Sequence, residues 1–389
     1  MKIRFFLFGG NNQMEGVFKK ELAKITLLKK LGLDCEVTFF ANQNKYIFND
    51  AIKIIKIDEN LNLIQRIRRA RYIAHVIGNQ IKNLDYPDCV LLRYPYYILY
   101  YPKNILKKKR RCKIVFEHNT KETDEFKLLT GCFSQIFLQE IFLGRFIRSQ
   151  ADAIVGVTDE ITQYQLKRCH NPDKPHITIG NGIDVASVPL RHHPPLITTE
   201  LHLLFVANVS RWHGIDRLIR GLASYDGKTG IILHVAGEGA ELPNLKKLVK
   251  DYGLTENVIF HGFMTGQPLD ELFNTCHIAV GSLGIHRKGL SQTSELKVRE
   301  YCARGIPWII ACRDPDFPDD FPYVHRIPAD ESPVNCEEVL EFAKRVCKDP
   351  EHPQKMRDYT MDHLDWSIKM KKLKEFLEKL VGESPSDLL

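Results

Sequence analysis

Short apolar runs alternate with amphipathic stretches along almost the whole chain, and this alternation restricts the fold more than any other feature. In the first half the pattern predicts strands at 3–8, 35–40, 51–57, 88–93, 113–117 and 153–157, with helices at 17–31, 61–81 and 132–148. Strands separated by helices pair in parallel, because the helix returns the chain across the sheet. The first half is therefore predicted to form a doubly wound α/β domain.

A second series of the same kind follows a stretch rich in proline and histidine, Val188 to Pro195, which is typical of a linker. It predicts strands at 201–207, 231–236, 258–261, 278–281 and 308–311, and helices at 215–224, 242–252, 269–274, 296–304 and 368–380. A chain of 389 residues is long enough for two domains. We expect an N-terminal domain over 1–187, a linker over 188–200 and a C-terminal domain over 201–364. Open parallel sheets bind ligands at the carboxyl ends of their strands, so both domains can line one interdomain cleft.

The composition excludes several classes of protein. With 44% hydrophobic and 26% charged residues, the chain is an ordinary globular protein rather than a disordered or collagen-like one. Its ten cysteines include no C-x-x-C pair, which predicts neither a disulfide framework nor a zinc site and fits reduced thiols in a cytosol. The apolar run near the N-terminus is too short for a signal peptide, and no apolar stretch is long enough to span a bilayer.

The net charge of +7 is unevenly distributed. Residues 1–187 contain 30 Lys and Arg against 19 Asp and Glu, a net of +11, while the remaining 25 basic and 29 acidic residues give −4. This asymmetry indicates an anionic partner for the first half, such as phospholipid, a pyrophosphate-linked substrate or nucleic acid, against the alternative of ordinary solvated lysines.

Two segments of the first half carry candidate ligand groups. The glycine-containing loop that ends at Gly16 follows the first predicted strand, where small residues let a ligand reach backbone amides and a helix start. It contains no G-x-G-x-x-G pattern, and a simple glycine turn is the alternative. Glu117 and His118 end the predicted strand 113–117, and His118 is suited either to a sugar hydroxyl and proton transfer or to a purely structural role.

Three further segments lie at or after residue 180. Asn181-Gly182 predicts a tight turn with positive φ. Arg211, at the entrance of a predicted helix, can pair with phosphate oxygens or lie on the surface. Ser294 precedes the helix 296–304 and is predicted to cap it, so that the helix start could hold a diphosphate and Glu300 could bind ribose hydroxyls.

Taken in order, these pieces resemble the GT-B glycosyltransferases, specifically glycosyltransferase family 4, the group 1 transferases. Residues 294–307 are similar to the family signature S-x-L-K-x-x-E-Y-x-A-x-G-x-P. The turn 181–184 and the run from Val235 to Phe263 also resemble family motifs, and the resemblance is strongest over 201–312. It implies the GT-B architecture, two Rossmann-like domains with an interdomain cleft, and a C-terminal helix at about 365–381 that packs back on the N-terminal domain.

The resemblance also implies an activity: a retaining hexosyl transfer from a nucleotide-diphosphate sugar, with a UDP-sugar as the expected donor. The N-terminal domain would bind the acceptor, a glycan or lipid-diphosphate-linked glycan in surface polysaccharide biosynthesis, and the C-terminal domain would bind the donor. Glu300 would hold the ribose, the segment from Ser294 to Lys297 the pyrophosphate, and the backbone at Phe263 and Met264 the base. The other implied donor contacts are Gly16, Asn181, Arg211, His213, Glu295 and Leu296, and the implied catalytic residues are His118, Arg211, Lys297 and Gln292.

Two departures from the family pattern affect this assignment. A second glutamate, which the family often has eight positions before the residue matching Glu300, is Gln292 here. The family's arginine and lysine for the phosphates align with Asn208 and His213, so Arg211 and Lys297 would supply the cations. With these cations the resemblance implies neither a metal nor another cofactor, and the acidic stretch containing Asp314 is predicted to be a solvated loop.

Two basic segments suggest where a membrane could bind. Arg66 and Arg69 lie on one predicted helix, and a run of basic residues follows tyrosine-rich sequence: Lys107, Lys108, Lys109 and Arg110. Basic residues near an anionic leaflet each contribute about 1 kcal/mol, and tyrosine suits a headgroup interface. We expect a cytoplasmic protein that docks peripherally on the inner face of the membrane, with a solvated basic face as the alternative.

Three other functions are consistent with parts of the sequence. A nucleotide-sugar epimerase shares the GT-B fold but needs no acceptor. A degenerate, non-catalytic transferase subunit would account for Gln292 and Asn208. A nucleic-acid binder would use the basic half, but the sequence contains no recognition module, and we expect no nucleic-acid partner.

Overall fold

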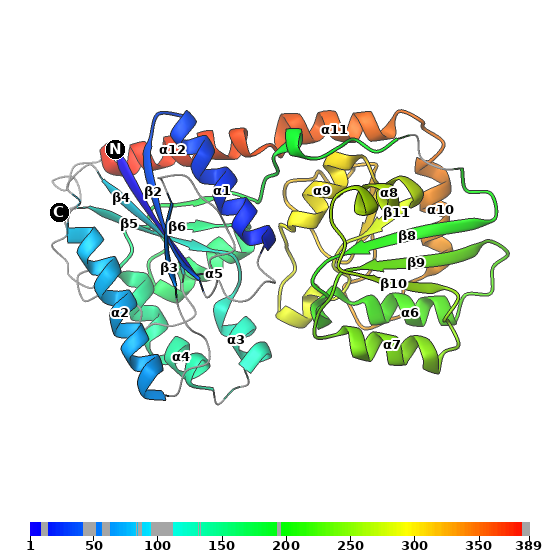
Figure 1. The fold of residues 1–389 in the computed structure, drawn as a ribbon, viewed down its shortest axis with the longest axis horizontal. Helices are drawn as coiled ribbons and strands as arrows, with labels where there is room; N and C mark the ends of the chain where they lie inside the picture. Colours follow the sequence, from blue (N-terminus) through cyan, green and yellow to red (C-terminus); the bar gives the residue numbers. More distant parts are fainter. Residues whose placement is uncertain are drawn as a thin grey trace. The chain divides into compact units, whose positions relative to one another are not determined.

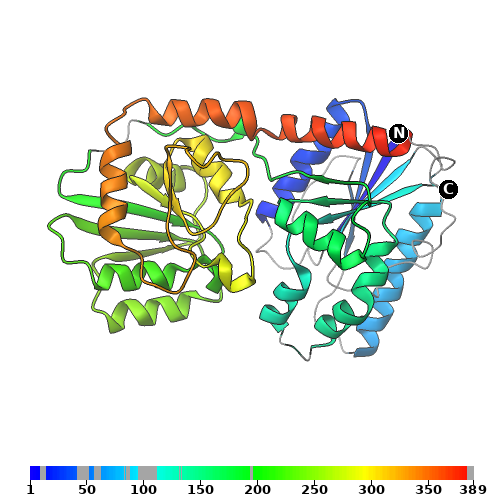
Figure 2. The same ribbon diagram turned by 180° about the vertical axis from the view of Figure 1, so that it is seen from behind.

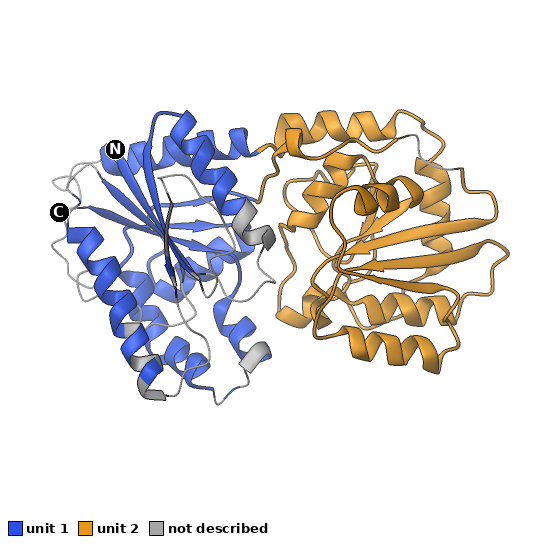
Figure 3. Ribbon diagram, in the orientation of Figure 1, with its two compact units in different colours: residues 1–180, 366–389 blue, residues 181–365 orange. Residues whose placement is uncertain are grey.

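The computed structural model describes residues 1–8, 15–41, 52–56, 63–82, 84, 88–94, 112–130, 132, 134–192 and 196–382. The chain divides into two compact units, one formed by Met1–Gly180 with Trp366–Leu389 and the other by Asn181–Asp365 (Figure 3). Residues 181–187, which the sequence analysis assigns to the first domain, and the linker expected over 188–200 both belong to the second unit.

The first unit is a parallel sheet with helices on both faces (Figure 1). Its described strands are β1 (Lys2–Phe8), β2 (Asp34–Ala41), β3 (Ile52–Lys56), β4 (Cys89–Arg93), β5 (Lys113–His118), β6 (Ala153–Gly156) and β7 (His176–Thr178). Its described helices are α1 (Glu15–Lys30), α2 (Leu63–Lys82), α3 (Glu122–Thr130), α4 (Gln135–Ser149), α5 (Asp159–Cys169) and α12 (Trp366–Gly382). The strand order β3-β2-β1-β4-β5-β6-β7 is that of a doubly wound Rossmann-like sheet.

Alternate residues of the central strands build one core of this unit. Phe6, Val90 and Phe116 are fully buried on one face, where Ile73 of α2 and Ile147 of α4 cover them. On the opposite side, α12 lies along α1, and Lys374 Nζ donates a hydrogen bond of 3.0 Å to the carbonyl of Leu31. The C-terminal helix therefore belongs to the first unit, although the whole second unit separates it in sequence from the other elements of the first unit.

The second unit repeats the same topology. Its described strands are β8 (Glu200–Val206), β9 (Gly230–Ala236), β10 (Val258–Gly262), β11 (Ile278–Val280), β12 (Trp308–Ile310) and β13 (Val324–Arg326). The described helices are α6 (Ile215–Ala223), α7 (Leu242–Asp251), α8 (Gln267–Thr275), α9 (Leu296–Arg304), α10 (Cys336–Val346) and α11 (His352–His363). All pairs are parallel, in the order β10-β9-β8-β11-β12-β13.

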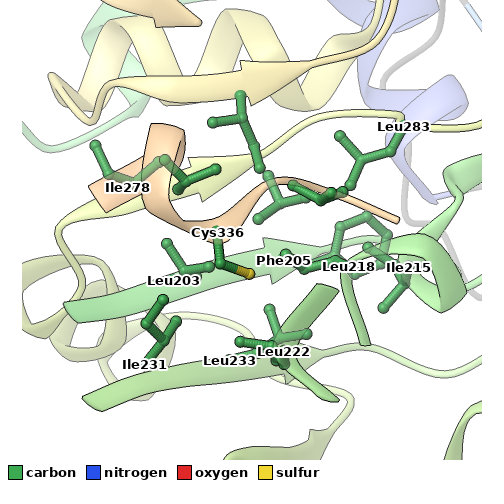
Figure 4. Packing of buried hydrophobic residues seen from close by; sticks show 14 of the residues in the cluster. Leu203, Phe205, Ile215, Leu218, Leu222, Ile231, Leu233, Ile278, Leu283 and Cys336 are labelled. Atoms are coloured by element: carbon green, nitrogen blue, oxygen red, sulfur yellow. The ribbon is translucent and has the colours of Figure 1, made fainter. Parts of the chain in front are cut away.

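The core of the second unit lies between this sheet and helices α6, α7 and α10. Leu203, Phe205 and Leu233 point from the strands toward Leu218 of α6 and Cys336 at the start of α10 (Figure 4). A fully buried leucine contributes roughly 1.5–3 kcal/mol relative to an exposed one. This packing fixes the strand ends from which the candidate site is built.

The structure departs from the sequence predictions in several elements. The helix predicted from residue 132 begins at Gln135, because the Ser134 hydroxyl caps it by accepting a bond from the Phe137 amide. Strands β7 and β13 and helices α3, α5, α10 and α11 were not predicted; α5 packs against β6 and β7 (Figure 2). The predicted tight turn at Asn181-Gly182 is wrong, since neither residue has a positive φ.

Candidate functional site

The carboxyl ends of the strands in the second unit carry a close-packed set of loops. Gly237 and Gly239 follow β9 with φ values of 138° and 153°. A Cβ atom on Gly239 would lie 2.2 Å from the Val209 carbonyl oxygen, so only glycine fits where these two loops meet. Their backbones are joined by the Val209 amide, which donates to the Glu238 carbonyl at 2.6 Å.

Helix α9 begins at this same edge of the sheet. Its N-cap is Glu295, whose side chain makes no capping bond, so the expectation that Ser294 caps the helix is wrong. The Ser294 hydroxyl instead accepts a 2.7 Å hydrogen bond from the Asn181 amide, and the Asn181 side chain donates to the Ser294 carbonyl. A helix start whose first amides lack a side-chain cap has N–H groups available for an anion.

Lys297, in the first turn of α9, lies largely buried beside this helix start. Its Nζ is 3.3 Å from Glu295 Oε2 and 3.3 Å from Ser282 Oγ, and it lies 4.7 Å from the ring centre of Phe205. Burial lowers the pKa of Lys297, and the Glu295 carboxylate opposes that shift. A buried ammonium with one anionic partner is well suited to a second anion.

Glu300 and Gln292 occupy different surroundings. Glu300 Oε1 accepts a 2.8 Å hydrogen bond from Arg304 Nε, and Arg304 also pairs with Asp270 at 2.6 Å. The Glu300 side chain remains 31% exposed, so ligand hydroxyls can reach it. Gln292, in the segment that leads into α9, forms an isolated parallel bridge with Arg313, which follows β12.

His213 and Arg211 lie on one 3-10 turn after β8, Arg211–His213. The Ser210 amide donates to His213 Nδ1 at 3.0 Å, and burial, with Lys297 and Lys288 nearby, holds the pKa of His213 well below its usual value. His213 is therefore neutral, and it cannot supply the positive charge that the family's phosphate-binding cation has at this position. Arg211 is exposed at the surface of the turn.

The loop after β10 contains the residues expected to read the base. Phe263 is 66% exposed, and Met264, which follows it, is half-buried. Gly237, whose amide donates to the Gly262 carbonyl at 2.6 Å, ties this loop to the one after β9. Within the second unit, most of the predicted donor residues thus lie on the loops after β8, β10 and β11 and on α9.

The first unit holds a separate polar cluster where β5 ends. Glu117 is buried between Lys20 and Lys24 of α1, at 3.3 and 2.5 Å, and the two lysines hold the pKa of Glu117 far below its usual value although burial acts to raise it. His118 is completely buried, with Nδ1 2.6 Å from Glu122 Oε1. The sequence analysis singled out Glu117 and His118 but missed both lysines and Glu122.

The remaining predicted residues of the first unit are less closely defined. Gly16 lies in the first turn of α1 rather than in a loop, and residues 9–14 of the predicted loop are outside the described residues. Arg66 and Arg69 both lie on α2, but only the side chain of Arg69, half-buried, is described. Lys107, Lys108, Lys109 and Arg110 lie outside the described residues.

The acidic loop after β12 is not the solvated segment that we expected. Asp314 is buried and pairs with the fully buried Arg299, which also contacts Asp316. Arg299 Nε donates to the Asn181 carbonyl at 2.9 Å, so this ion cluster supports the start of α9. In the part of the chain that the structure describes, no cluster of three metal-binding side chains occurs, and no helix is long and apolar enough to cross a membrane.

Comparison with known proteins agrees with this geometry. Residues 190–311 match the family model described as glycosyl transferases group 1. An uncharacterized glycosyltransferase, MJ1069, of Methanocaldococcus jannaschii is 27% identical over 166 residues, an alignment that spans 40% of this chain and 41% of that protein. The chain therefore aligns with less than half the length of this relative.

Solved structures share the fold over nearly the whole chain. Sucrose-phosphate synthase from Thermosynechococcus elongatus has a TM-score of 0.71 at 15% identity, covering 98% of this chain and 100% of that one. HepE of Anabaena, solved in complex with UDP-glucose, has a TM-score of 0.66 at 13% identity, covering 97% and 99%. The family model matched by residues 190–311, together with the signature on α9, assigns this part of the chain to the group 1 glycosyl transferases, and the two Rossmann-like units have the GT-B fold.

Proposed function

We propose that the protein transfers a sugar, with retention of anomeric configuration, from a nucleotide-diphosphate sugar to a glycan or lipid-diphosphate-linked glycan. The observation that carries this proposal is the start of α9. Its first amides have no side-chain cap, and its first turn carries the largely buried Lys297, whose Nζ lies 3.3 Å from Ser282 Oγ. Both features favour a diphosphate. HepE, solved with UDP-glucose, supports a UDP-sugar as the donor and a hexosyl group as the one transferred.

The chemistry of the reaction requires these groups. Breaking the anomeric bond develops positive charge on the sugar ring and negative charge on the departing diphosphate. Lys297 and the α9 amides stabilise the diphosphate, Arg211 adds a cation from the loop after β8, and Glu300 binds the ribose hydroxyls. Attack from the face that the diphosphate leaves retains the anomeric configuration without a carboxylate nucleophile. Gln292 contacts the transferred sugar.

Donor binding is tested with a thermal-shift panel of UDP-, GDP- and ADP-sugars. At one hundred times its dissociation constant, the correct donor stabilises the protein by about 2.7 kcal/mol. Lys297→Met is expected to abolish this shift and to lower kcat by roughly a hundredfold or more. Lys250→Met, on an exposed position of α7, is the matched control and should change neither quantity. Absence of a shift with every nucleotide sugar would refute the proposal.

A turnover assay distinguishes sugar transfer from the two alternative functions, an epimerase and a non-catalytic subunit. Donor consumption that requires a glycan or lipid-linked acceptor supports the transferase. Rearrangement of the donor by the protein alone would instead identify an epimerase. Donor binding without turnover on a panel of acceptors would identify a non-catalytic subunit.

We propose that one surface of the first unit docks peripherally on the inner face of the membrane, because its side chains suit an anionic bilayer. Phe142 of α4 is 75% exposed and Phe146 is 51% exposed, on one side of that helix. Helix α2 covers the same face of the sheet and exposes Arg68, Arg71 and Tyr72. Aromatic side chains beside arginines suit a headgroup region, and the net +11 of residues 1–187 favours anionic lipid.

Flotation with liposomes tests this docking. The protein is expected to float with vesicles containing anionic lipid and to be released by salt, and Phe142→Asp should reduce the bound fraction several-fold. Met361→Asp alters an exposed apolar residue of the second unit and serves as the control. Equal recovery with neutral vesicles, or none with either kind, would contradict the assignment.

A further inference from the structure

Glu295 is a largely buried carboxylate at the start of α9 that the fold leaves with few partners. Its side chain is 11% exposed, it does not cap the helix, and neither of its oxygens accepts a hydrogen bond from the residues that the structure describes. Within the same described residues its one ion pair is with Lys297, with 3.3 Å between Oε2 and Nζ. A buried carboxylate is costly unless an opposite charge compensates it, so the role of Glu295 depends on Lys297.

Two uncharged groups also contact the Lys297 amine. Ser282 Oγ, after β11, accepts a hydrogen bond from Nζ at 3.3 Å, and the Phe205 ring of β8 has its centre 4.7 Å from Nζ. The face of an aromatic ring attracts a cation, and a hydroxyl accepts one of the three N–H groups of an ammonium. Neither of these groups carries the negative charge that compensates a buried ammonium fully.

The other titratable groups nearby supply no negative charge either. Cys312, which follows β12, is a neutral thiol because burial raises its pKa well above the usual value. His213 is neutral because burial lowers its pKa, and Lys288 adds a second positive charge beside it. Glu295 is therefore the one anion among these described neighbours of Lys297.

The balance between burial and Glu295 decides whether Lys297 carries its proton. Burial lowers the pKa of Lys297, and the Glu295 carboxylate opposes that shift. Without the carboxylate the pKa would fall further, because a desolvated ammonium would have no anion to replace its hydration. A neutral amine has no charge with which to attract a diphosphate.

We propose that Glu295 is a positioning residue, which holds the Lys297 side chain at the start of α9 as an ammonium that pairs with the diphosphate of the donor. This inference rests on the proposed function, because it takes the diphosphate as the anion that meets Lys297. The carboxylate then has two opposite effects: it keeps the lysine charged, which favours binding, and it repels the diphosphate, which opposes binding. Above neutral pH the first effect grows with pH, because Lys297 loses its proton more readily without Glu295.

The first test uses Glu295→Gln, which preserves the shape of the side chain and removes its charge. Calorimetry measures the dissociation constant at pH 6 and pH 9 for whichever of UDP, GDP and ADP the wild type binds most tightly. At pH 6 the variant should bind this nucleotide at least as tightly as the wild type. At pH 9 it should bind roughly tenfold more weakly, which is the effect of a pKa lower by one unit. Titration of the nucleotide itself cancels in the ratio of the two dissociation constants.

A ratio that is the same at both pH values would overturn the proposal, because a merely structural role of Glu295 does not depend on pH. Glu295→Asp keeps the charge and should keep the wild-type pH dependence. Glu341→Gln, at an exposed position of α10, is the matched control and should leave the dissociation constant unchanged. In a Lys297→Arg background, Glu295→Gln should cause no loss that grows with pH, since a guanidinium stays protonated. Such a loss in that background would assign Glu295 an effect independent of Lys297 and contradict the inference.

The second readout follows the Lys297 amine without any ligand. In protein labelled with 13C at the lysine Cε, the Lys297 resonance is assigned by its disappearance in Lys297→Met, and its chemical shift is titrated with pH. Glu295→Gln should lower the pH at which this resonance titrates, and Glu341→Gln should not. An unchanged titration in Glu295→Gln would refute the inference.

The two readouts distinguish this inference from the proposed function. If the wild-type protein binds none of the three nucleotides while the Lys297 titration moves as described, the proposed function fails and the control of the Lys297 charge by Glu295 stands. If the wild type binds a nucleotide and turns over its sugar, but neither readout responds to Glu295→Gln, the positioning role is wrong and the transferase remains.

Discussion

The two Rossmann-like units share a strand order and both bury ion pairs, but the second unit also carries a row of histidines across its sheet. In the first unit, buried ions of opposite charge neutralise each other. Lys24 Nζ, for example, lies 2.5 Å from Glu117 and 3.0 Å from Glu21, and Arg148 lies 2.7 Å from Glu140 and 2.9 Å from Glu122. Each charge is compensated within the cluster, so its removal leaves an opposite charge without a partner in a desolvated site.

In the second unit a row of histidines crosses the sheet, and two of them, His234 and His277, are buried. His202 Nδ1 lies 2.9 Å from His234 Nε2, and His234 Nδ1 lies 2.9 Å from His261 Nε2. The His202 amide donates to His277 Nδ1 at 2.9 Å. The row runs over β10, β9, β8 and the residue before β11, with Glu200, 3.5 Å from His202, as its neighbouring carboxylate. His234, at the centre of the row, uses both of its ring nitrogens in these contacts.

The contrast teaches that equal topology does not imply equal sensitivity to pH. Burial lowers the pKa of both His234 and His277 to about 4. In the first unit, the burial of Glu117 and Glu122 is outweighed by their cationic partners, and the pKa values of these carboxyls are lowered. The second unit should therefore weaken in mild acid, and the first unit only in strong acid.

The largest expected effect is the acid sensitivity of the second unit. Between pH 6.5 and 4 the unfolded histidines bind protons that the folded ones exclude, so stability falls as the pH falls. At pH 5 the loss is roughly 2 kcal/mol from each of His234 and His277. For Glu117 and Glu122 the loss begins only below their ordinary pKa of 4.5. Hydrogen exchange by mass spectrometry, corrected for intrinsic rates, should show peptides of residues 181–365 opening first; earlier opening of the first unit would reverse the comparison.

The next largest effect is expected for Arg148→Met, which leaves Glu122 and Glu140 buried without their shared cation. The first unit should lose about 3–5 kcal/mol, because an uncompensated buried charge is more costly than the pair was favourable. Urea titration with the same exchange readout measures this. Arg145→Met, at an exposed position of the same helix, should leave the midpoint unchanged. A loss confined to the second unit would mean that the cluster does not stabilise the unit that contains it.

The comparison also explains what could be predicted from the sequence. The two α/β series and the signature on α9 follow from local periodicity and spacing, and the structure contains them. The ion clusters could not be predicted in this way. Lys20 and Lys24 resemble ordinary solvated lysines in the sequence, because their partner Glu117 lies 97 and 93 positions away. The histidine row requires the register of four strands, which no local pattern contains. Ser294 was taken for a cap because its partner, Asn181, is 113 residues away.

A moderate effect is expected from breaking the row at its centre with His234→Val. Near pH 7 the change removes two hydrogen bonds of 2.9 Å and leaves nitrogen atoms of His202 and His261 without partners, so the second unit should lose about 1–2 kcal/mol. At pH 5 the wild type also loses stability through the lowered pKa of His234, and the variant does not. The difference in free energy of unfolding between the two proteins should therefore vanish at pH 5. Parallel stability curves at the two pH values would show that His234 does not carry the acid sensitivity.

The smallest effect is expected for Lys20→Met, and it sharpens the account of the first unit. Burial lowers the pKa of Lys20, whereas the pKa of Lys24 is raised because Glu117 and Glu21 outweigh its burial. Lys20 is also farther from both carboxylates, at 3.3 and 3.8 Å, than Lys24 is. Lys20→Met should therefore change the free energy of unfolding by less than about 1 kcal/mol, and Lys24→Met by about 3 kcal/mol or more. Equal losses in urea titrations of the two variants would mean that charge count, rather than the geometry of each pair, determines the stability of the cluster.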